Sequence, residues 1–314
     1  MDKKTAVCDI CSRRKAFFLR PYSGVKLCRK CFVGSIEDKV RATISRYQMF
    51  KFDDKIAVAV SGGKDSVSLL HILSKLERKY TKAELVAVTV DEGISGYRDE
   101  ALEIVTENCE KLGIEHLAVS FKELFGYTLD QMVKRLKGQG AEKSTPCAYC
   151  GVLRRKALNM AARRLKADKL ATAHTLDDET QTILLNIFHG DVLRIAKEKP
   201  VTDDVHPKLV RRVKPYCELP ERETSLYAYV KGIRFQSSLC PYASEALRND
   251  ARMMLNMLEE KHPGIKFTIF SSIERIRPAL EEMASKEGLG ECSECGEPTT
   301  DKVCRTCQLL KIVK

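Results

Sequence analysis

The sequence predicts an α/β fold, a doubly wound parallel sheet, with a small four-cysteine module at each end of the chain. In the middle of the chain, short β-branched runs alternate with segments of helical periodicity. At both ends, two C-x-x-C motifs follow each other closely. We therefore expect an N-terminal module over residues 1–34, a catalytic domain with a helical C-terminal part over 35–287, and a C-terminal module over 288–314.

The alternation of strands and helices is read from hydrophobic periodicity. Strands are expected at 55–60, 84–90, 114–119 and 169–173. Helices are expected at 66–80, 98–112, 121–136, 152–165 and 177–188. A β-α-β-α order implies parallel strands joined by right-handed crossovers. Beyond residue 190 the pattern weakens to an extended segment at 205–213 and helices at 221–232, 242–262 and 265–286.

Composition narrows the function classes. The 314 residues include 54 Lys and Arg against 43 Asp and Glu, so the net charge of +11 favours a polyanionic partner. No run of about 18 apolar residues is present, which excludes a transmembrane helix. The first residues lack the apolar core of a secretory signal. We therefore expect a cytoplasmic protein without a membrane partner.

Thirteen cysteines are many for a reducing compartment, where they indicate metal binding or catalysis rather than disulfides. The first module places two C-x-x-C pairs sixteen residues apart, with Cys8, Cys11, Cys28 and Cys31. The last module places its pairs eight residues apart, with Cys292, Cys295, Cys304 and Cys307. Four thiolates close the coordination shell of zinc, so we expect two structural zinc sites.

A phosphate-binding loop follows the strand expected at 55–60. It consists of Ser61, Gly62, Gly63, Lys64, Asp65 and Ser66. Glycines let backbone N–H groups approach an anion, and the helix N-terminus adds free donors and a positive dipole end. Asp65 suits a phosphate site if Mg²⁺ bridges its carboxylate and the phosphate oxygens. The loop is neither a Walker motif nor a dinucleotide fingerprint.

Other strand ends add to the predicted nucleotide site, because ligands of open α/β sheets bind at the carboxyl edge. Backbone groups of Ala59 and Val90 are expected to read the adenine. His174 and Asp178 stand where the strand at 169–173 gives way to a helix. An acidic first helical turn is common for dipole reasons alone. The loop at 61–66 favours a role in the site for both residues.

Five cysteines remain outside the two end modules. Cys147 and Cys150 form a lone C-x-x-C before a basic helix, and Cys240 lies about ninety residues later. Their spacing allows a [4Fe-4S] cluster with one open iron, a zinc ion with a fourth ligand, or a redox disulfide. Cys109 is expected to be a small buried apolar residue, and Cys217 is a weak further ligand candidate.

The hexapeptide SGGKDS resembles the signature of the PP-loop ATP pyrophosphatases. Together with Pro146-Cys147-x-x-Cys150-Gly151, the HTLDDE segment and Cys240-Pro241-Tyr242, it resembles the tRNA 2-thiolation enzymes of the TtcA/TtuA family. The paired cysteine knuckles at both ends resemble the TtuA and NcsA branch, of archaeal or eukaryotic-cytosolic type. The resemblance covers nearly the whole chain.

The resemblance implies an ATP-dependent tRNA-uridine 2-sulfurtransferase. Uridine O2 would attack the α-phosphate of ATP with Mg²⁺ bound, and sulfide from a [4Fe-4S] cluster on Cys147, Cys150 and Cys240 would then displace AMP. Asp178 matches the family's catalytic aspartate, and Gly151 joins the ATP site. Arg154 stands where some members carry a catalytic lysine, and we assign it, with Ser61 and Asp65, a catalytic role. The Gly151–Arg155 segment resembles the NcsA branch, which acts on wobble uridine 34.

Basic residues gather in two segments that fit tracking of an RNA phosphate backbone. The first comprises Arg154, Arg155, Lys156, Arg163, Arg164, Lys166 and Lys169. The second comprises Lys208, Arg211, Arg212 and Lys214. A solvated face is the alternative for any single lysine. Phe17, Phe18 and Tyr22 suit either base stacking or packing of the zinc module.

Several alternatives stay open on sequence alone. The modified uridine could be position 54 in the T loop, and a cysteine persulfide could replace the cluster. A PP-loop amide ligase and a non-enzymatic RNA-binding protein are more distant alternatives. Free sulfide and a ubiquitin-like carrier with a C-terminal thiocarboxylate are both compatible sulfur donors, and a homodimer is compatible with the sequence.

Overall fold

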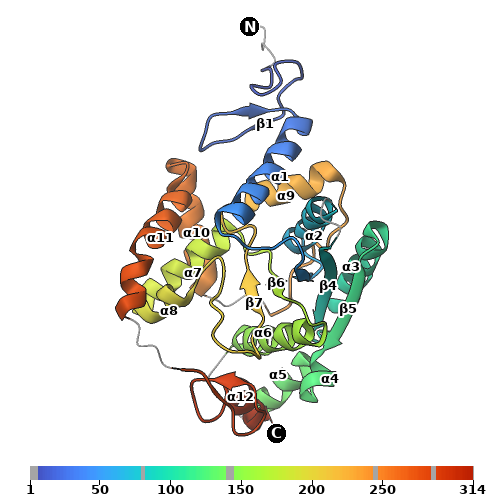
Figure 1. The fold of residues 1–314 in the computed structure, drawn as a ribbon, viewed down its shortest axis with the longest axis vertical. Helices are drawn as coiled ribbons and strands as arrows, with labels where there is room; N and C mark the ends of the chain where they lie inside the picture. Colours follow the sequence, from blue (N-terminus) through green and yellow to red (C-terminus); the bar gives the residue numbers. More distant parts are fainter. Residues whose placement is uncertain (1–5, 79–81, 139–144, 243–246, 284–287, 314) are drawn as a thin grey trace.

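A computed structural model describes residues 6–78, 82–138, 145–242, 247–283 and 288–313 of the chain (Figure 1). Its centre is a five-stranded parallel sheet in the order β5-β4-β3-β6-β7. The strands are β3 (Lys55–Ala59), β4 (Glu84–Asp91), β5 (Glu115–Ser120), β6 (Lys169–Ala171) and β7 (Arg211–Val213). The doubly wound parallel sheet expected from the sequence is thus confirmed.

The strand order reverses between β3 and β6. From β3 the chain winds outward to β4 and β5, then returns to place β6 on the other side of β3. Parallel sheets of this kind bind ligands where the order reverses, at the carboxyl ends of the strands. The segments that follow β3 and β6 are the loop at 61–66 and the segment at 172–178, so the fold brings the two predicted nucleotide segments to one edge.

Side chains of the central strand alternate between two hydrophobic cores, one on each face of the sheet. Ile56 and Val58 are buried with α2 (Lys64–Glu77) and α3 (Arg98–Leu112), whereas Ala57 is buried with α5 (Leu129–Gly138) and α6 (Pro146–Arg164). Because successive strand residues point to opposite faces, a continuous apolar strand is buried on both sides.

Three elements differ from the sequence expectation. The helix expected at 121–136 is divided into α4 (Phe121–Phe125) and α5, since Gly126 ends α4 with a left-handed φ of 83°. The basic helix begins at Pro146 rather than at 152, so Cys147 and Cys150 lie on α6 itself. Proline at a first helical position is favourable because its missing N–H has no intrahelical partner there. The extended segment at 205–213 supplies a fifth strand, β7.

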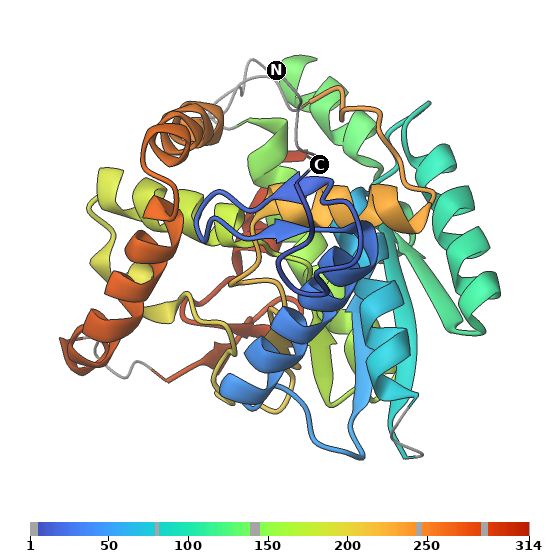
Figure 2. The same ribbon diagram turned by 90° about the horizontal axis from the view of Figure 1, so that it is seen from above.

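Five further helices complete this part of the fold. Between β6 and β7 lie α7 (Leu176–Phe188) and α8 (Val192–Lys197), and after β7 come α9 (Glu221–Lys231), α10 (Leu247–Lys261) and α11 (Ile265–Met283). Of these, α9 packs on α2, whereas α10 and α11 pack on α7. Figure 2 shows α10 and α11 on the side of the molecule away from α3. The expected helices at 66–80, 242–262 and 265–286 extend in part outside the described residues.

The two cysteine modules lie at opposite ends of the molecule (Figure 1). The first pairs β1 (Phe18–Leu19) with β2 (Lys26–Leu27) and continues into α1 (Arg29–Arg46), which passes the expected boundary at residue 34. The second pairs β8 (Gly290–Glu291) with β9 (Pro298–Thr299), and its α12 (Arg305–Val313) packs against α5 and α6. Across the described ranges, no helix has the length and apolar character needed to cross a bilayer.

Candidate functional site

The loop at 61–66 has the geometry that a phosphate site requires. Gly62 adopts a φ of +93°, and a Cβ there would lie 2.9 Å from the Cβ of Ala101, so both conformation and space demand glycine. The Ser61 N–H donates to Oγ of Ser66 at 3.0 Å, and the two hydroxyl oxygens lie 3.1 Å apart. Gly63 is the N-cap of α2, whose first N–H groups are therefore free to bind an anion.

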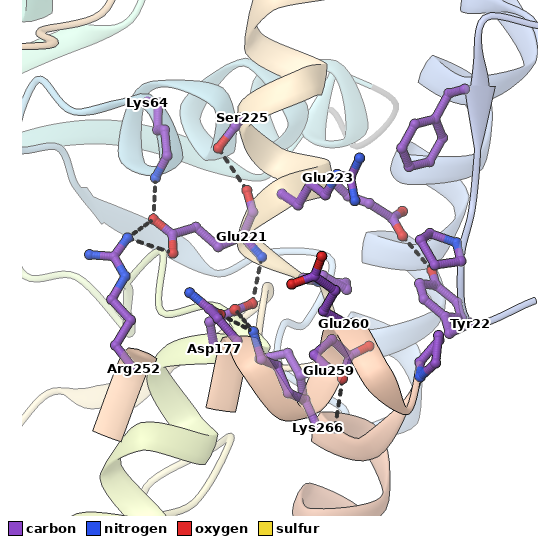
Figure 3. Close-up of a pocket in the computed structure, with 17 residues that line it drawn as sticks. Tyr22, Lys64, Asp177, Glu221, Glu223, Ser225, Arg252, Glu259, Glu260 and Lys266 are labelled. Atoms are coloured by element: carbon purple, nitrogen blue, oxygen red, sulfur yellow. Dashed lines mark hydrogen bonds and ion pairs between the residues drawn. The ribbon is translucent and has the colours of Figure 1, made fainter. Parts of the chain in front are cut away.

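Charged side chains surround the start of α2 (Figure 3). Lys64 Nζ lies 2.7 Å from a carboxylate oxygen of Asp65 and 2.7 Å from one of Glu221. Glu221 also accepts two 3.0 Å hydrogen bonds from Arg252 on α10. Burial raises the pKa of Asp65 above its ordinary value, although the Lys64 charge opposes this shift. The lysine predicted to bind phosphate is thus held between two carboxylates.

A cavity of about 680 Å³ opens beside Lys64, between α9, α10, α11 and the first module. Glu221, Arg252 and Lys266 line it, as Figure 3 shows. Its lining includes no cysteine, and neither Ser61 nor His174. The cavity therefore reaches only the Lys64 side of the phosphate loop. The other residues of the predicted nucleotide site lie outside it.

The segment after β6 combines a helix cap with a histidine. The carboxylate of Asp178 accepts hydrogen bonds from the N–H (2.9 Å) and hydroxyl (2.8 Å) of Thr175, which caps α7. Both bonds use Oδ2. His174 Nδ1 lies 2.9 Å from the hydroxyl of Thr172. His174 keeps an exposed surface, yet it sits among so much protein that desolvation, aided by Lys214, lowers its pKa to about 4.

The Ala59 and Val90 backbones lie at the ends of β3 and β4, beside the loop. Arg98 of α3 fixes this edge: it donates to the carbonyl oxygens of Ser61 at 2.9 Å and Val90 at 2.8 Å. Since the Val90 carbonyl is occupied in this way, only the remaining backbone groups of this strand end could read an adenine.

Arg98 is also paired with Glu92, and Glu92 with Arg154. Nε of Arg98 lies 2.9 Å from one Glu92 oxygen, and Nη1 of Arg154 lies 3.6 Å from the other. The first contact is not aligned as a hydrogen bond, so its attraction is mainly Coulombic. This chain of charges connects the phosphate loop to α6, four residues beyond Cys150.

Cys147, Cys150 and Cys240 come together although ninety residues separate the first two from the third. The Cys147 thiol donates to the Tyr242 carbonyl oxygen at 3.1 Å, which brings the 240–242 segment to the start of α6. Cys147 is exposed, Cys240 is partly exposed, and burial raises the pKa of Cys150 to about 11. The charge of Cys240 acts on both other thiols.

The spacing of these three sulfurs bears on the ligand they suit. One tetrahedral zinc with Zn–S bonds of about 2.3 Å needs thiolates roughly 4 Å apart. The three sulfurs are not within 4.8 Å of one another, unlike those of the two end modules. Three converging thiolates set further apart suit a larger, multinuclear group.

The two end modules each form a compact four-sulfur cluster. In each module the four sulfur atoms lie within 4.8 Å of one another, which is the arrangement of a structural metal site. Lys156 of α6 donates to Cys295 Sγ at 3.1 Å and so offsets negative charge on the C-terminal cluster. Cys109 and Cys217 are both buried in the hydrophobic core, away from these clusters.

Most of the predicted basic surface is paired with acids. Six of its eleven members have carboxylate partners: Arg154 with Glu92, Arg163 with Glu297, Arg164 with Glu123, Lys169 with Asp54, Lys208 with Glu291, and Lys214 with Glu179 and Glu198. Phe18 is buried, and Tyr22 bonds to Glu223 and packs on Phe267, so these two rings stabilise the first module. Phe17 remains partly exposed beside Phe32.

Several residues of the site carried no sequence signal. Glu221, Thr224 and Arg252 reach the phosphate loop from α9 and α10, and Thr224 donates to the Asp65 carboxylate. Glu92 and Arg98 are likewise ordinary charged residues in the sequence. Only long-range packing brings them to the site.

The PP-loop domain family matches residues 35–258. The tRNA 2-thiolation protein NcsA of Haloferax volcanii is 37% identical over 98% of this chain and 99% of its own length. The cytoplasmic tRNA 2-thiolation protein 1 of Oryza sativa is 37% identical over 97% of this chain and 82% of its own. The solved structure of the U34-tRNA thiolase NcsA from Methanococcus maripaludis, with its [4Fe-4S] cluster, superposes with a TM-score of 0.83. It has 34% identity and covers 97% of this chain and 95% of its own. The chain therefore belongs to the NcsA and cytoplasmic tRNA 2-thiolation protein 1 family of PP-loop proteins.

Proposed function

We propose that this chain is a cytoplasmic, ATP-dependent tRNA-uridine 2-sulfurtransferase that acts on the wobble uridine at position 34. The observation that carries the proposal is the convergence of Cys147, Cys150 and Cys240 at one end of α6, connected through Arg154 and Glu92 to the phosphate loop. Relatives that carry the name of tRNA 2-thiolation support the reaction. The Methanococcus maripaludis enzyme, a U34-tRNA thiolase, supports the position.

The phosphate loop would bind and activate ATP. The Ser61 hydroxyl and the backbone N–H groups at Gly63 and the start of α2 would hold the phosphates, and Asp65 would hold Mg²⁺ against their oxygens. Lys64 would exchange the Glu221 carboxylate for a phosphate oxygen, while Arg252 would keep Glu221 in place. The lowered pKa keeps His174 neutral near pH 7, so this side chain adds no positive charge to the site.

In the first half-reaction, uridine O2 forms a bond to the α-phosphorus of ATP. The bond from that phosphorus to the bridging oxygen breaks, and pyrophosphate leaves with its Mg²⁺. The O2 atom becomes a better nucleophile as N3 loses its proton. Oδ1 of Asp178 accepts no hydrogen bond from the described part of the chain and is the proton acceptor we assign, because Thr175 occupies Oδ2.

In the second half-reaction, hydrosulfide adds to C2 and the C2–O2 bond breaks, so that AMP leaves with the oxygen. Arg154 would stabilise negative charge on the departing phosphate. Its guanidinium is available for this role because its contact with the Glu92 carboxylate is long, at 3.6 Å. Cys147, Cys150 and Cys240 would hold a [4Fe-4S] cluster, which supplies an open iron for binding sulfide. Each end module would hold one structural zinc ion.

The proposal is tested with purified protein under anaerobic conditions. The protein is incubated with unmodified tRNA, ATP, Mg²⁺ and sulfide, and the digested tRNA is analysed by mass spectrometry for position-specific 2-thiouridine. We expect one thiolated nucleoside per tRNA at position 34, with stoichiometric AMP and pyrophosphate. Thiolation at position 54 would reject the assigned uridine, and release of AMP without thiolation would reject the reaction.

A further inference from the structure

Arg155 and Arg212 approach each other from different elements without an acidic partner. Arg155 lies in the third turn of α6, and Arg212 is the middle residue of β7. In the described part of the chain, neither guanidinium has a hydrogen bond or ion pair. Arg212 is the strongest opposing charge at Arg155, and Arg154 and Arg194 add to the repulsion.

Among the described residues, Glu198 offsets part of this repulsion, since its charge acts on both Arg155 and Arg212. Its carboxylate is bound to Lys214 at 3.0 Å and forms no ion pair with either arginine. Desolvation, and then Arg212, hold the pKa of Arg155 below its ordinary value. Six residues of the predicted basic surface have carboxylate partners, whereas in the described part of the chain Arg155 and Arg212 have none, so positive charge is only partly compensated here. An anion bound there would remove the repulsion.

The position of the pair identifies the anion. Nη1 of Arg155 lies 3.6 Å from the point where a Cβ on Gly151 would stand, next to Cys150. Asn159, one turn beyond Arg155 on α6, accepts a hydrogen bond from the Val210 N–H at 2.9 Å, so α6 lies beside the segment that leads into β7. Arg212 lies beside Leu170 of β6, two residues before Thr172, whose hydroxyl contacts His174 at 2.9 Å. The pair is therefore between the three converging cysteines and the segment at 174–178. A uridine that is activated at one and receives sulfur at the other must pass through this space.

We propose that Arg155 and Arg212 bind one phosphodiester group of the tRNA, adjacent to the uridine that is modified. The assignment rests on the proposed function. Guanidinium groups bind phosphate oxygens in a bidentate manner, and two of them on separate elements fix both position and direction of a nucleotide. The ATP phosphates already have donors in the loop at 61–66, so this pair of arginines is available for a backbone phosphate beside the target base.

The first test compares Arg155→Gln/Arg212→Gln with a matched control, Arg41→Gln/Arg234→Gln. The control removes the same charge from exposed arginines that already have acidic partners, at 2.9 Å for Arg41–Asp38 and 2.8 Å for Arg234–Glu103. Affinity for tRNA is measured by titration over a range of KCl concentrations. We expect the test variant to bind at least about 10-fold more weakly, with the log–log salt slope reduced by roughly 0.7 to 0.9 for the lost phosphate contact. The control should change little.

The second test identifies the phosphate. Anticodon stem-loops are made with a neutral methylphosphonate in place of single phosphodiesters around the target uridine. One substitution next to that uridine should weaken wild-type binding about as much as the double variant does, and should not weaken the double variant further. Equal sensitivity of both proteins at every linkage would overturn the inference.

The remaining outcomes separate this inference from the proposed function. Unchanged tRNA affinity with a raised KM for ATP would mean that the pair serves the nucleotide, and would reject the inference. Equal losses in both variants would show only a loss of net charge, which also rejects it. Wild-type protein that shows the predicted linkage-specific binding but forms no 2-thiouridine would reject the proposed function alone.

Discussion

Arg98 donates a hydrogen bond from Nη1 to the carbonyl oxygen of Ser61, at 2.9 Å. This contact joins the first residue of the phosphate loop to α3, and a second bond from Nη2 to the Val90 carbonyl joins it to the end of β4. Glu92 balances the guanidinium charge at 2.9 Å. Both side chains are about 95% buried, so water does little to stabilise either charge. The conformation of the loop therefore depends on a buried arginine that is not itself predicted to bind ATP.

Arg98→Met should destabilise the protein by about 3–5 kcal/mol, the usual cost of removing one partner of a buried ion pair. The substitution leaves the buried Glu92 carboxylate with only its 3.6 Å contact to the half-exposed Arg154, and leaves two carbonyl oxygens without these donors. Glu92→Gln in the same chain should recover part of the loss. Urea unfolding of the metal-loaded protein measures both changes.

Arg234→Met is the matched control for this experiment. Arg234 also pairs with two carboxylates, but it is 47% exposed and solvent screens these pairs, so we expect a much smaller loss of stability than for Arg98→Met. Equal losses for the buried and exposed arginines would contradict the role assigned to the Arg98–Glu92 pair.

Gly62→Ala should abolish ATP binding by distorting the phosphate loop. A Cβ at this position meets the Ala101 Cα at 3.0 Å as well as its Cβ, and these atoms belong to a packed helix that cannot yield. Gly96→Ala is the control, because Gly96 also has a positive φ, of 68°, but its Cβ would meet open space. Isothermal titration with ATP and Mg²⁺ should show binding in the control and none in Gly62→Ala.

Asp65→Asn should stop pyrophosphate release while stabilising the fold at neutral pH. Burial raises the pKa of Asp65 above its ordinary 3.8, so the ionised carboxylate costs stability at pH 7. That cost grows as the pH rises from 3.8 through the raised pKa of Asp65. It is absent below pH 3.8, where the aspartic acid is protonated and, like the asparagine of the variant, uncharged. Chemical unfolding at pH 4 and pH 7 should therefore show a gain only at pH 7. A loss at pH 7 would mean that the Lys64–Asp65 attraction outweighs desolvation.

The central sheet was predictable from the sequence because buried parallel strands are continuous apolar runs. Lys55–Ala59 is such a run, and the glycines after it could only mark a tight strand-to-helix connection. The division of the helix at Gly126 was missed, since one glycine inside a periodic pattern does not distinguish a tolerated residue from a helix end. The start of α6 at Pro146 was missed because no apolar periodicity accompanies its first turn.

The candidate site was predictable only where its residues occur in local motifs. The loop at 61–66 and the two end modules have fixed spacings that imply their chemistry. Glu221 and Arg252 meet Lys64 only because α9 and α10 pack over α2 and α7, and no sequence spacing records that arrangement. The same limit applied to the basic surface, where charge counts could not separate the paired Arg163 from the unpaired Arg155.

His174→Gln should reduce the loss of stability on acidification. The pKa of His174 falls from 6.5 in the unfolded chain to about 4 in the fold, so the unfolded state binds a proton first. This contribution is fully present above pH 6.5 and is lost as pH falls toward 4. Urea unfolding at pH 7, 6, 5 and 4 should show a shallower decline for the variant than for wild type. His189→Gln, on an exposed helix end, should follow wild type; parallel declines for all three proteins would refute the prediction.

The last prediction concerns Cys147, Cys150 and Cys240. Protein purified without oxygen should be brown and contain about four irons per chain, as expected for a cubane held by three thiolates, together with two zinc ions. Replacing any one of the three by Ala should remove iron and thiolation, yet preserve ATP binding and both zinc ions, because the end modules form separate four-sulfur clusters. Cys109→Ala is the matched control: this thiol is buried in the core, so the change should affect stability but not iron content. Iron-free protein that fully thiolates tRNA with sulfide would exclude the cluster. The transfer would then use a disulfide between Cys147 and Cys240, which hydrosulfide opens to a persulfide and a thiol and which forms again when the outer sulfur passes to C2.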